Sequence, residues 1–346
     1  MAPAGRRILI AAPISPGVVG GAERLTEALD QALRRAGHRV ERLELPLELR
    51  PRRRALEQAL WWRLQTPDAD FDCVLVTKFP AYALRHPRKV VWLYHQLREI
   101  YDLWGTTHSA WSEAPEERVV RAAIQAIDRR ALGECARRFA ISRTVALRLQ
   151  RWSGLDAEVL HPPLLLEQDP RCEAYEDFFL LAGRLERAKR IDLALEALAR
   201  MRHPAPALIA GRGPEAERLQ ALAAELGLGD RVRFAGFVSE TELRELYARC
   251  RAVLAVPLQE DFGLVAAEAL AARKPVVTCA DSGGVLELVE DGVSGLVAAA
   301  DPGALGAALD RLAGEPELAA RLGAAGERRA RASTWERVLS RLLAEL

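Results

Sequence analysis

Short apolar runs alternate with amphipathic stretches along the whole chain. Runs such as "RILIAAP" (7–13) and "CVLVTK" (73–78) are rich in Val, Ile and Leu and are short, so they predict buried strands. Stretches such as "GAERLTEALDQALRRAG" (21–37) and "RIDLALEALARM" (190–201) repeat apolar residues every three or four positions, as amphipathic helices do. Strands and helices that alternate in this way predict parallel sheets covered by helices on both faces.

The predicted strands fall into two series. The first series comprises 7–13, 39–45, 73–78, 89–95, 138–143 and 157–163, and the second comprises 177–184, 207–213, 231–237, 252–258, 275–281 and 294–300. Between them the periodicity lapses, and a chain of 346 residues is longer than one core usually supports. The sequence therefore predicts an α/β protein with two doubly wound, Rossmann-like domains, 1–163 and 177–332, joined by a linker at 164–176. A terminal amphipathic helix at 333–346 packs on its own domain or crosses back to the first.

Composition excludes some classes of protein. The net charge is +1, so no basic excess points to a nucleic-acid partner. No apolar stretch reaches the ~18 residues of a membrane span, and the seven-residue run near the start is too short for a signal peptide. The five cysteines form no C-x-x-C pair, which favours reduced thiols in a cytoplasmic protein. Lysine is rare among many arginines: its positions are Lys78, Lys89, Lys189 and Lys274.

Candidate chemistry follows the strands of the second series. Because the carboxyl ends of parallel strands meet at one edge of a sheet, the loops after these strands should lie together. The loops are "GRLERAKR" with Arg184 and Lys189, "GRGPE" with Gly211, "GFVSE" with Phe237 and Val238 before an expected N-cap at Ser239, "EDFGLVAAEAL" (260–270), and "DSGG" (281–284). Each loop carries glycines or cations, which predicts a site for a phosphate-bearing ligand.

The stretch "EDFGLVAAEAL" places one carboxylate on each side of an expected helix start. Glu260 precedes the helix that opens at Gly263, whereas Glu268 lies too far along it to interact with the helix N-terminus. The two acids are on the order of 10 Å apart by helical rise. A diphosphate bound between them would be held by the helix N-terminus and by Arg184 and Lys189, while the acids bind hydroxyl groups at its two ends. A sugar nucleotide has this arrangement.

Each residue also has a purely structural interpretation. Glu268 could be an exposed helix acid, Arg184 a salt-bridged surface residue and Lys189 a solvated charge at a helix start. The "DSGG" loop could be a simple turn. The order of these features on successive strands favours a common site.

In combination, these stretches resemble the retaining GT-B glycosyltransferases of family 4, whose hallmark is an E-x7-E motif. The matching stretches are "GRLERAKR", "GRGPE", "VRFAGFVSETELRELY", "EDFGLVAAEALAARKPVV", "SGGVLELVEDGVSGLV" and "TWERV". The resemblance implies two domains that face each other across a cleft. It also implies that Glu260 contacts the donor sugar and that Glu268 contacts the ribose. Arg184 and Lys189 would contact the diphosphate, and Phe237 and Val238 would contact the base. The sugar and phosphate would also be contacted by Gly263, Leu264 and Val265.

The first half contributes two further candidates. Gly20 and Gly21 lie between the first strand and the first helix, but G-x-G-x-x-G is missing, which argues against a dehydrogenase. The resemblance implies that this loop reaches across the cleft towards donor phosphate and acceptor. His95 ends a predicted strand beside Arg98 and is expected to orient sugar or acceptor, against the alternative of a structural histidine. Its surroundings are similar to the H-x-x-x-R-Y-x-x-D region of mannosyltransferase-like members, with Arg98 and Tyr101 offset.

The stretch "PDADFDC" contains D-x-D twice, at Asp68, Asp70 and Asp72. It precedes a predicted strand, whereas ligands bind at carboxyl ends, so it indicates a solvated turn. No catalytic metal is predicted.

Together with the residues above, the resemblance implies a metal-independent, retaining hexosyltransferase that uses no cofactor beyond its donor, GDP-mannose or a UDP-sugar. The acceptor is a hydroxyl of a glycan, a lipid-linked molecule or a small molecule. A sugar-nucleotide epimerase of GT-B fold and a non-catalytic sugar-nucleotide-binding partner subunit stay open as alternatives. The helical stretch at 54–65, with Trp61 and Trp62, leaves peripheral membrane contact open beside ordinary helix packing.

Overall fold

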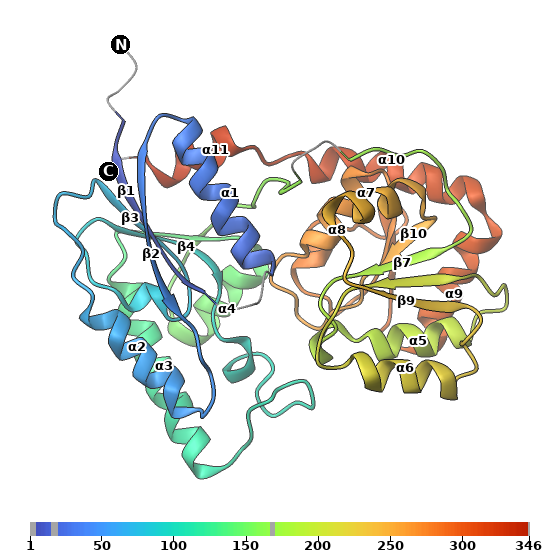
Figure 1. Cartoon of the computed structure of the whole chain (residues 1–346), viewed down its shortest axis with the longest axis horizontal. Coiled ribbons are helices and arrows are strands. Elements are labelled where there is room, and N and C mark those ends of the chain that lie inside the picture. Colours follow the sequence, from blue (N-terminus) through green and yellow to red (C-terminus); the bar gives the residue numbers. More distant parts are fainter. Residues whose placement is uncertain (1–4, 15–19, 167–169, 345–346) are drawn as a thin grey trace. The chain divides into compact units, whose positions relative to one another are not determined.

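The computed structural model describes residues 5–14, 20–166 and 170–344. The chain divides into two compact units, Met1–Leu165 with Ser333–Leu346, and Leu166–Ala332. In the described residues, each unit contains one six-stranded sheet whose neighbouring strands are parallel (Figure 1). The predicted α/β class with two doubly wound sheets is confirmed.

The first sheet has the strand order β2-β1-β3-β4-β5-β6. Its strands are β1 (Arg7–Ile14), β2 (Arg39–Pro46), β3 (Cys73–Lys78), β4 (Lys89–His95), β5 (Arg137–Ala140) and β6 (Glu158–Val159). Its helices are α1 (Gly21–Arg35), α2 (Arg53–Leu64), α3 (Pro115–Gly133), α4 (Arg143–Ser153) and α11 (Trp335–Leu342), with short 3-10 turns η1 (Ala81–Ala83) and η2 (Arg98–Ile100). Helices α1 and α11 lie together on one face, and α2 and α3 lie on the other (Figure 1).

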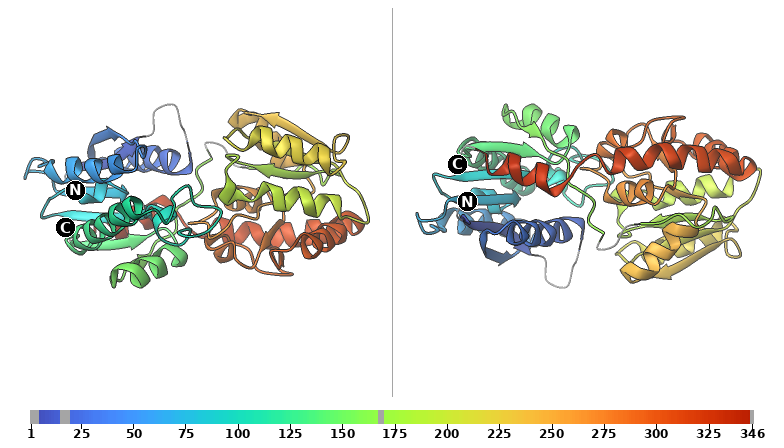
Figure 2. Two further views of the ribbon diagram at one scale, coloured as in Figure 1. Left: turned by 90° about the horizontal axis from the view of Figure 1, so that it is seen from below. Right: turned by 90° about the horizontal axis from the view of Figure 1, so that it is seen from above.

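The second sheet has the strand order β12-β11-β10-β7-β8-β9. Its strands are β7 (Phe179–Ala182), β8 (Ala207–Ala210), β9 (Val232–Gly236), β10 (Ala252–Leu254), β11 (Val276–Cys279) and β12 (Gly295–Ala298). Its helices are α5 (Ile191–Ala199), α6 (Ala216–Glu225), α7 (Glu240–Arg249), α8 (Leu264–Ala271), α9 (Pro302–Gly314) and α10 (Pro316–Ala330), with 3-10 turns η3 (Arg187–Lys189) and η4 (Gly284–Glu287). Figure 2 shows the strands of each unit lying between its helices.

Several strands end earlier than the apolar pattern predicts. The run at 157–163 pairs only at Glu158–Val159, because Pro162 and Pro163 have no N–H to donate to a ladder. The strand predicted at 138–143 ends at Ala140, since Ser142 instead caps α4 by accepting a hydrogen bond from the Val145 N–H at 3.0 Å. The predicted N-cap at Ser239 is confirmed, with a reciprocal capping box to Glu242.

The last helix packs within the first unit. The ring of Trp335 in α11 meets Trp92 of β4 edge-on, with centroids 6.2 Å apart. Arg137 donates hydrogen bonds to the carbonyls of Arg341 and Ala344, at 3.0 and 2.9 Å. The apolar face of α11 therefore closes the first core.

The described helices include none with the length and apolar character needed to cross a membrane. All five cysteines are free thiols, of which Cys73, Cys135, Cys250 and Cys279 are buried.

Asp128 of α3 is a fully buried acid beneath the first sheet. The hydroxyl of Tyr101 donates a hydrogen bond of 2.6 Å to its carboxylate. Burial raises the pKa of Asp128 to about 7, although the hydrogen bond from Tyr101 acts in the opposite direction. This acid therefore makes the stability of the first unit depend on pH.

We expect the Asp128→Asn variant to lose that dependence. The stabilising protonated form is fully present below the unfolded pKa of about 4, and its contribution is lost as the pH rises through about 7. The tryptophans all lie in the first unit, so their fluorescence reports its unfolding. Between pH 5 and pH 8 the free energy of unfolding of the first unit should fall by on the order of 2–3 kcal/mol more in wild type than in the variant, and the Tm of wild type should fall further accordingly. Parallel pH profiles would contradict the assignment.

Candidate active site

The loops that follow β7 and β8 lie directly on one another at the carboxyl edge of the second sheet. The Leu185 N–H donates to the Arg212 carbonyl at 3.0 Å. A Cβ at Gly211 would lie 1.8 Å from the Gly183 carbonyl oxygen, so only glycine fits there. Gly211 thus allows a close backbone approach between the two loops.

The loops after β10 and β11 are packed in the same way. The Gly284 N–H donates to the Glu260 carbonyl at 2.8 Å, and a short parallel bridge joins Glu260 to Gly283. A Cβ at Gly284 would lie 2.5 Å from the Asp261 carbonyl oxygen. The "DSGG" loop therefore packs against the E-x7-E loop and holds it in place.

The side chain of Arg190 links these loops to one another. Its backbone is left-handed, with φ of 50°, between η3 and α5. Its buried guanidinium donates to both carboxylate oxygens of Asp281, at 2.6 and 2.8 Å, and to the carbonyls of Val256 and Pro257, at 2.8 and 3.1 Å. One side chain thus fixes the loops after β7, β10 and β11.

Lys189 and Glu260 form an ion pair at this edge. The ammonium of Lys189 lies 2.9 Å from each carboxylate oxygen of Glu260. The side chains are 32% and 16% exposed, so the pair is open to solvent on one side. The cation expected to hold a diphosphate and the acid expected to hold a sugar are therefore direct neighbours.

Helix α8 starts in the same loop. Gly263 is its N-cap in a left-handed conformation, with φ of 95°, and a Cβ there would lie 2.8 Å from Val285. Since glycine has no side chain, it provides no cap for the first N–H groups, which belong to Leu264 and Val265. Val265 also faces Gly183, whose ideal Cβ position is 3.9 Å from its side chain. The positive end of α8 thus opens among the loops described above.

Glu268 is 2% exposed, so its interpretation as an exposed helix acid is wrong. The hydroxyl of Tyr247 in α7 donates a hydrogen bond of 3.2 Å to its carboxylate. Helix α8 is buried continuously from Ala266 to Ala271 because it packs against α10 and the sheet. Glu268 is thus a buried carboxylate among the apolar residues of α8.

The remaining candidates of the second unit are more exposed. Arg184 pairs with Glu186 at 2.5 Å, and both side chains are 44% exposed. Phe237 follows β9 and is 69% exposed, with the Arg212 guanidinium 5.8 Å from its ring centroid. Val238 beside it is half-buried. An accessible aromatic face is what a nucleotide base stacks on.

The candidates of the first unit lie at the carboxyl edge of its own sheet. His95 ends β4, and its Nδ1 lies 3.0 Å from the Gln96 carbonyl, which places the proton on Nδ1 because a carbonyl only accepts. Gly20 precedes α1 and donates its N–H to Glu23 at 3.0 Å, and Gly21 is the first residue of that helix. Residues 15–19 of the predicted glycine loop lie outside the described residues.

Glu23 in turn pairs with Lys78 at the end of β3, at 2.5 Å. Burial acts to raise the pKa of Glu23, but the Lys78 ammonium outweighs it, and the pKa lies below its usual value. Two residues near His95 have structural partners: Tyr101 bonds to Asp128, and Asp102 forms an ion pair with Arg148.

The D-x-D residues form the turn before β3, at the amino edge of the first sheet. Asp68 accepts the Asp70 N–H at 3.1 Å and pairs with Arg7 at 2.9 Å. Within the described part of the chain, no three His, Cys, Asp or Glu side chains are grouped as metal ligands are.

The sequence did not reveal Arg190, Asp281 or Tyr247. Arg190 and Asp281 stand in stretches that were singled out for their neighbours, but their pairing spans 91 positions. Tyr247 looks like an ordinary helix residue. The contacts of these side chains form only when the loops and helices pack together, so the sequence alone does not show them.

Replacing Arg190 should loosen the second unit. We expect Arg190→Ala to cost on the order of 3 kcal/mol of folding free energy, because Asp281 and two carbonyls lose a buried partner. Circular dichroism should show the loss, whereas the tryptophan signal of the first unit should keep its midpoint. The matched control is Arg187→Ala, which removes a 61% exposed side chain 3.3 Å from Glu215 and should change stability by less than about 0.5 kcal/mol. Equal effects of the two variants would refute the role of Arg190.

Comparison with known proteins gives sequence matches in the half of the chain that carries the E-x7-E stretch. Residues 168–329 match the family model described as glycosyl transferases group 1. The D-inositol 3-phosphate glycosyltransferase of Thermomonospora curvata is 39% identical over 178 residues, which cover 47% of this chain and 41% of that relative. The match therefore spans about two fifths of the curated relative's length.

Solved structures match over nearly the whole chain. Sucrose-phosphate synthase from Thermosynechococcus elongatus superposes with a TM-score of 0.79 at 21% identity, over 97% of both chains. Anabaena HepE, solved in complex with UDP and glucose, gives 0.68 at 18% identity, over 99% of this chain and 100% of that one. At these identities the likeness concerns the fold alone. Residues 168–329 thus match glycosyl transferases group 1, consistent with the resemblance of the E-x7-E stretch, in a chain with the GT-B fold.

Proposed function

We propose that this chain transfers a hexose-type sugar from a nucleoside-diphosphate sugar to an acceptor hydroxyl, with retention at the anomeric carbon. The observation that carries the proposal is the Lys189–Glu260 ion pair, 2.9 Å at both oxygens, in the loops where the glycine-started helix α8 begins. A cation, a free helix start and two acids on one sheet edge suit a diphosphate with a sugar at each end.

Lys189 would exchange partners when the donor binds. In the structure, the Glu260 carboxylate balances the charge of the Lys189 ammonium. A diphosphate oxygen would take the place of that carboxylate. The released oxygens of Glu260 would then accept hydrogen bonds from hydroxyls of the donor sugar. The pair is partly exposed, so this exchange needs no opening of the core.

Stabilisation of the leaving group would supply most of the catalysis. The bond between the anomeric carbon and the diphosphate breaks, and the electron pair leaves with the diphosphate. Lys189, Arg184 and the N–H groups that open α8 would hold the charge that develops there. The acceptor oxygen forms the new bond on the same face, and its proton passes to an oxygen of the departing diphosphate. Positive charge comes from these groups, which makes the reaction independent of a metal.

The nucleoside would occupy the other end of the site. Glu268, held by Tyr247, would accept hydrogen bonds from the ribose hydroxyls, and Phe237 would stack on the base. The UDP and glucose named for Anabaena HepE support a UDP-sugar as donor, and GDP-mannose is the second candidate. His95 would orient the sugar or the acceptor, which is a hydroxyl of a glycan, a lipid-linked molecule or a small molecule.

The Lys189→Ala variant should lose about 100-fold to 1,000-fold in kcat, because it removes one donor to the developing charge. Transfer from the preferred donor to its acceptor is the measurement. Arg218→Ala serves as the control, since it removes an exposed arginine paired with Asp192 and Glu215 in the same unit. Turnover by Lys189→Ala at the rate of the control would exclude this role.

The Glu268→Gln variant should act mainly on donor binding. The amide keeps the shape and one acceptor oxygen but loses the charge, so the KM for the donor should rise by about tenfold while kcat falls less. A variant with an unchanged KM and unchanged donor-induced stabilisation would show that Glu268 is structural.

A panel of UDP-, GDP- and ADP-sugars should identify the donor. The correct nucleotide at about 100 times its Kd adds about 2.7 kcal/mol of stability to the unit that binds it. The second unit should therefore melt at a higher temperature with one base and not with the others. If no member of the panel shifts the melting of wild type, the proposed donor class is wrong.

A further inference from the structure

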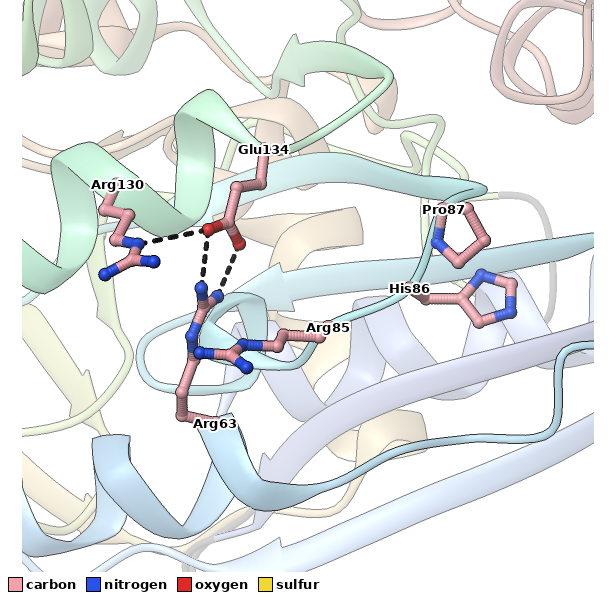
Figure 3. Close-up of a pocket in the computed structure, with 6 residues that line it drawn as sticks. All are labelled: Arg63, Arg85, His86, Pro87, Arg130 and Glu134. Carbon is pink, nitrogen blue, oxygen red and sulfur yellow. Dashed lines mark hydrogen bonds and ion pairs between the residues drawn. The ribbon is translucent and has the colours of Figure 1, made fainter.

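A positively charged pocket lies on the helical face of the first unit. It has a volume of about 480 Å³ and is lined by Arg63, Arg85, His86, Pro87, Arg130 and Glu134 (Figure 3). Helices α2 and α3 and the segment before β4 supply these residues. The pocket lies at the amino edge of the first sheet, whereas His95 lies at the carboxyl edge.

Cations outnumber acids in this pocket. Arg63 donates to both oxygens of Glu134, at 2.5 Å for one of them, and Arg130 donates to the same carboxylate at 3.3 Å. The buried ammonium of Lys89 is 3.9 Å from Glu134 on the inner side. Three cations thus share one carboxylate. Arg85 adds a fourth, and within the described residues it makes no ion pair.

His86 and Asp68 do not cancel this excess. The Nδ1 of His86 accepts the Arg88 N–H at 3.1 Å, and burial lowers the pKa of His86, so its ring is neutral near pH 7. Asp68 beyond it is paired with Arg7 at 2.9 Å. The pocket therefore attracts anions.

An apolar stripe runs beside the pocket along α2. Leu60, Trp61 and Leu64 are 50%, 46% and 75% exposed, and their spacing of i, i+1 and i+4 places them on one outward face. Trp62, which points inward, is 1% exposed and anchors the helix to the core. Arg63 stands on the flank between stripe and pocket. The sequence left both adjacent tryptophans as candidates for membrane contact. In the structure, only Trp61 is exposed to a partner.

We propose that this face, made of the arginine pocket and the stripe Leu60–Trp61–Leu64, docks on the surface of a bilayer of anionic phospholipids. The pocket would receive a headgroup phosphate from the arginines, which match its geometry with paired N–H groups. The three apolar side chains would enter the boundary between headgroups and acyl chains, where Trp is favoured. A nucleic acid would use the cations but leave the apolar stripe in water.

The docking surface does not depend on the proposed sugar transfer. Its residues come from helices and loops at the amino edge of the first sheet, and none is a candidate for donor binding. Its test therefore needs no activity measurement, and its failure would leave the proposed function untouched.

Sedimentation with phospholipid vesicles tests the proposal. Wild type should bind vesicles made of equal amounts of phosphatidylcholine and phosphatidylglycerol. It should bind vesicles made of phosphatidylcholine alone much less. Arg85→Ala should weaken binding about fivefold, since one arginine near an anionic surface contributes about 1 kcal/mol. Trp61→Ser combined with Leu64→Ser should weaken it by about tenfold or more. High salt should remove the contribution of Arg85 and leave part of the apolar one.

Matched controls separate docking from loss of fold. Arg35→Ala removes an exposed arginine of α1 on the opposite face, and Leu147→Ser removes a 51% exposed leucine of α4. Both should bind anionic vesicles as wild type does, and all variants should keep the tryptophan melting transition. Equal binding to both kinds of vesicle, or equal losses in test and control variants, would overturn the proposal. Capture of an RNA oligomer in place of vesicles, abolished by Arg85→Ala, would also overturn it.

Discussion

The candidate active site depends on one buried guanidinium. Arg190 is bonded to Asp281 and to the carbonyls of Val256 and Pro257, and these partners belong to loops that leave different strands. The same loops are also joined by the Lys189–Glu260 pair and by backbone hydrogen bonds, such as that from the Leu258 N–H to the Ala188 carbonyl at 2.8 Å. The left-handed backbone of Arg190, costly for a residue with a Cβ, is maintained because four hydrogen bonds hold it. Lys189, its neighbour in the chain, is positioned by the same contacts.

The rarity of lysine in this chain has a structural counterpart. Lys78 pairs with Glu23, Lys89 donates to three carbonyls at 2.9 Å, Lys189 binds both oxygens of Glu260, and Lys274 lies 4.0 Å from the ring centroid of Tyr175. Lys78, Lys89 and Lys274 are buried, whereas Lys189 is partly exposed. Where a long, planar and exposed cation suffices, as at the docking surface, the chain uses arginine.

Much of the fold follows from the sequence because strand and helix patterns are local. The strands lie near their predicted places, and the sequence alone predicts that the loops of the E-x7-E region meet at one sheet edge. What the sequence could not show depends on contacts between distant positions. Examples are the burial of Glu268 against Tyr247, the pairing of Lys189 with Glu260, and the choice of Trp62 over Trp61 for the core. Prolines at 162 and 163 ended a strand that hydrophobicity alone extended.

Two ion pairs at the candidate site differ in what they can do. The guanidinium of Arg190 is buried, with its side chain 9% exposed, although its partner Asp281 is 37% exposed, so breaking this contact would leave the buried cation without its counter-charge. Lys189 and Glu260 are partly solvated, and water or a ligand oxygen can replace either partner at small cost. The first pair therefore fixes the frame, and the second can exchange within it. The proposed transfer, in which a charged donor binds and a more highly charged diphosphate leaves, would use both properties in adjacent residues.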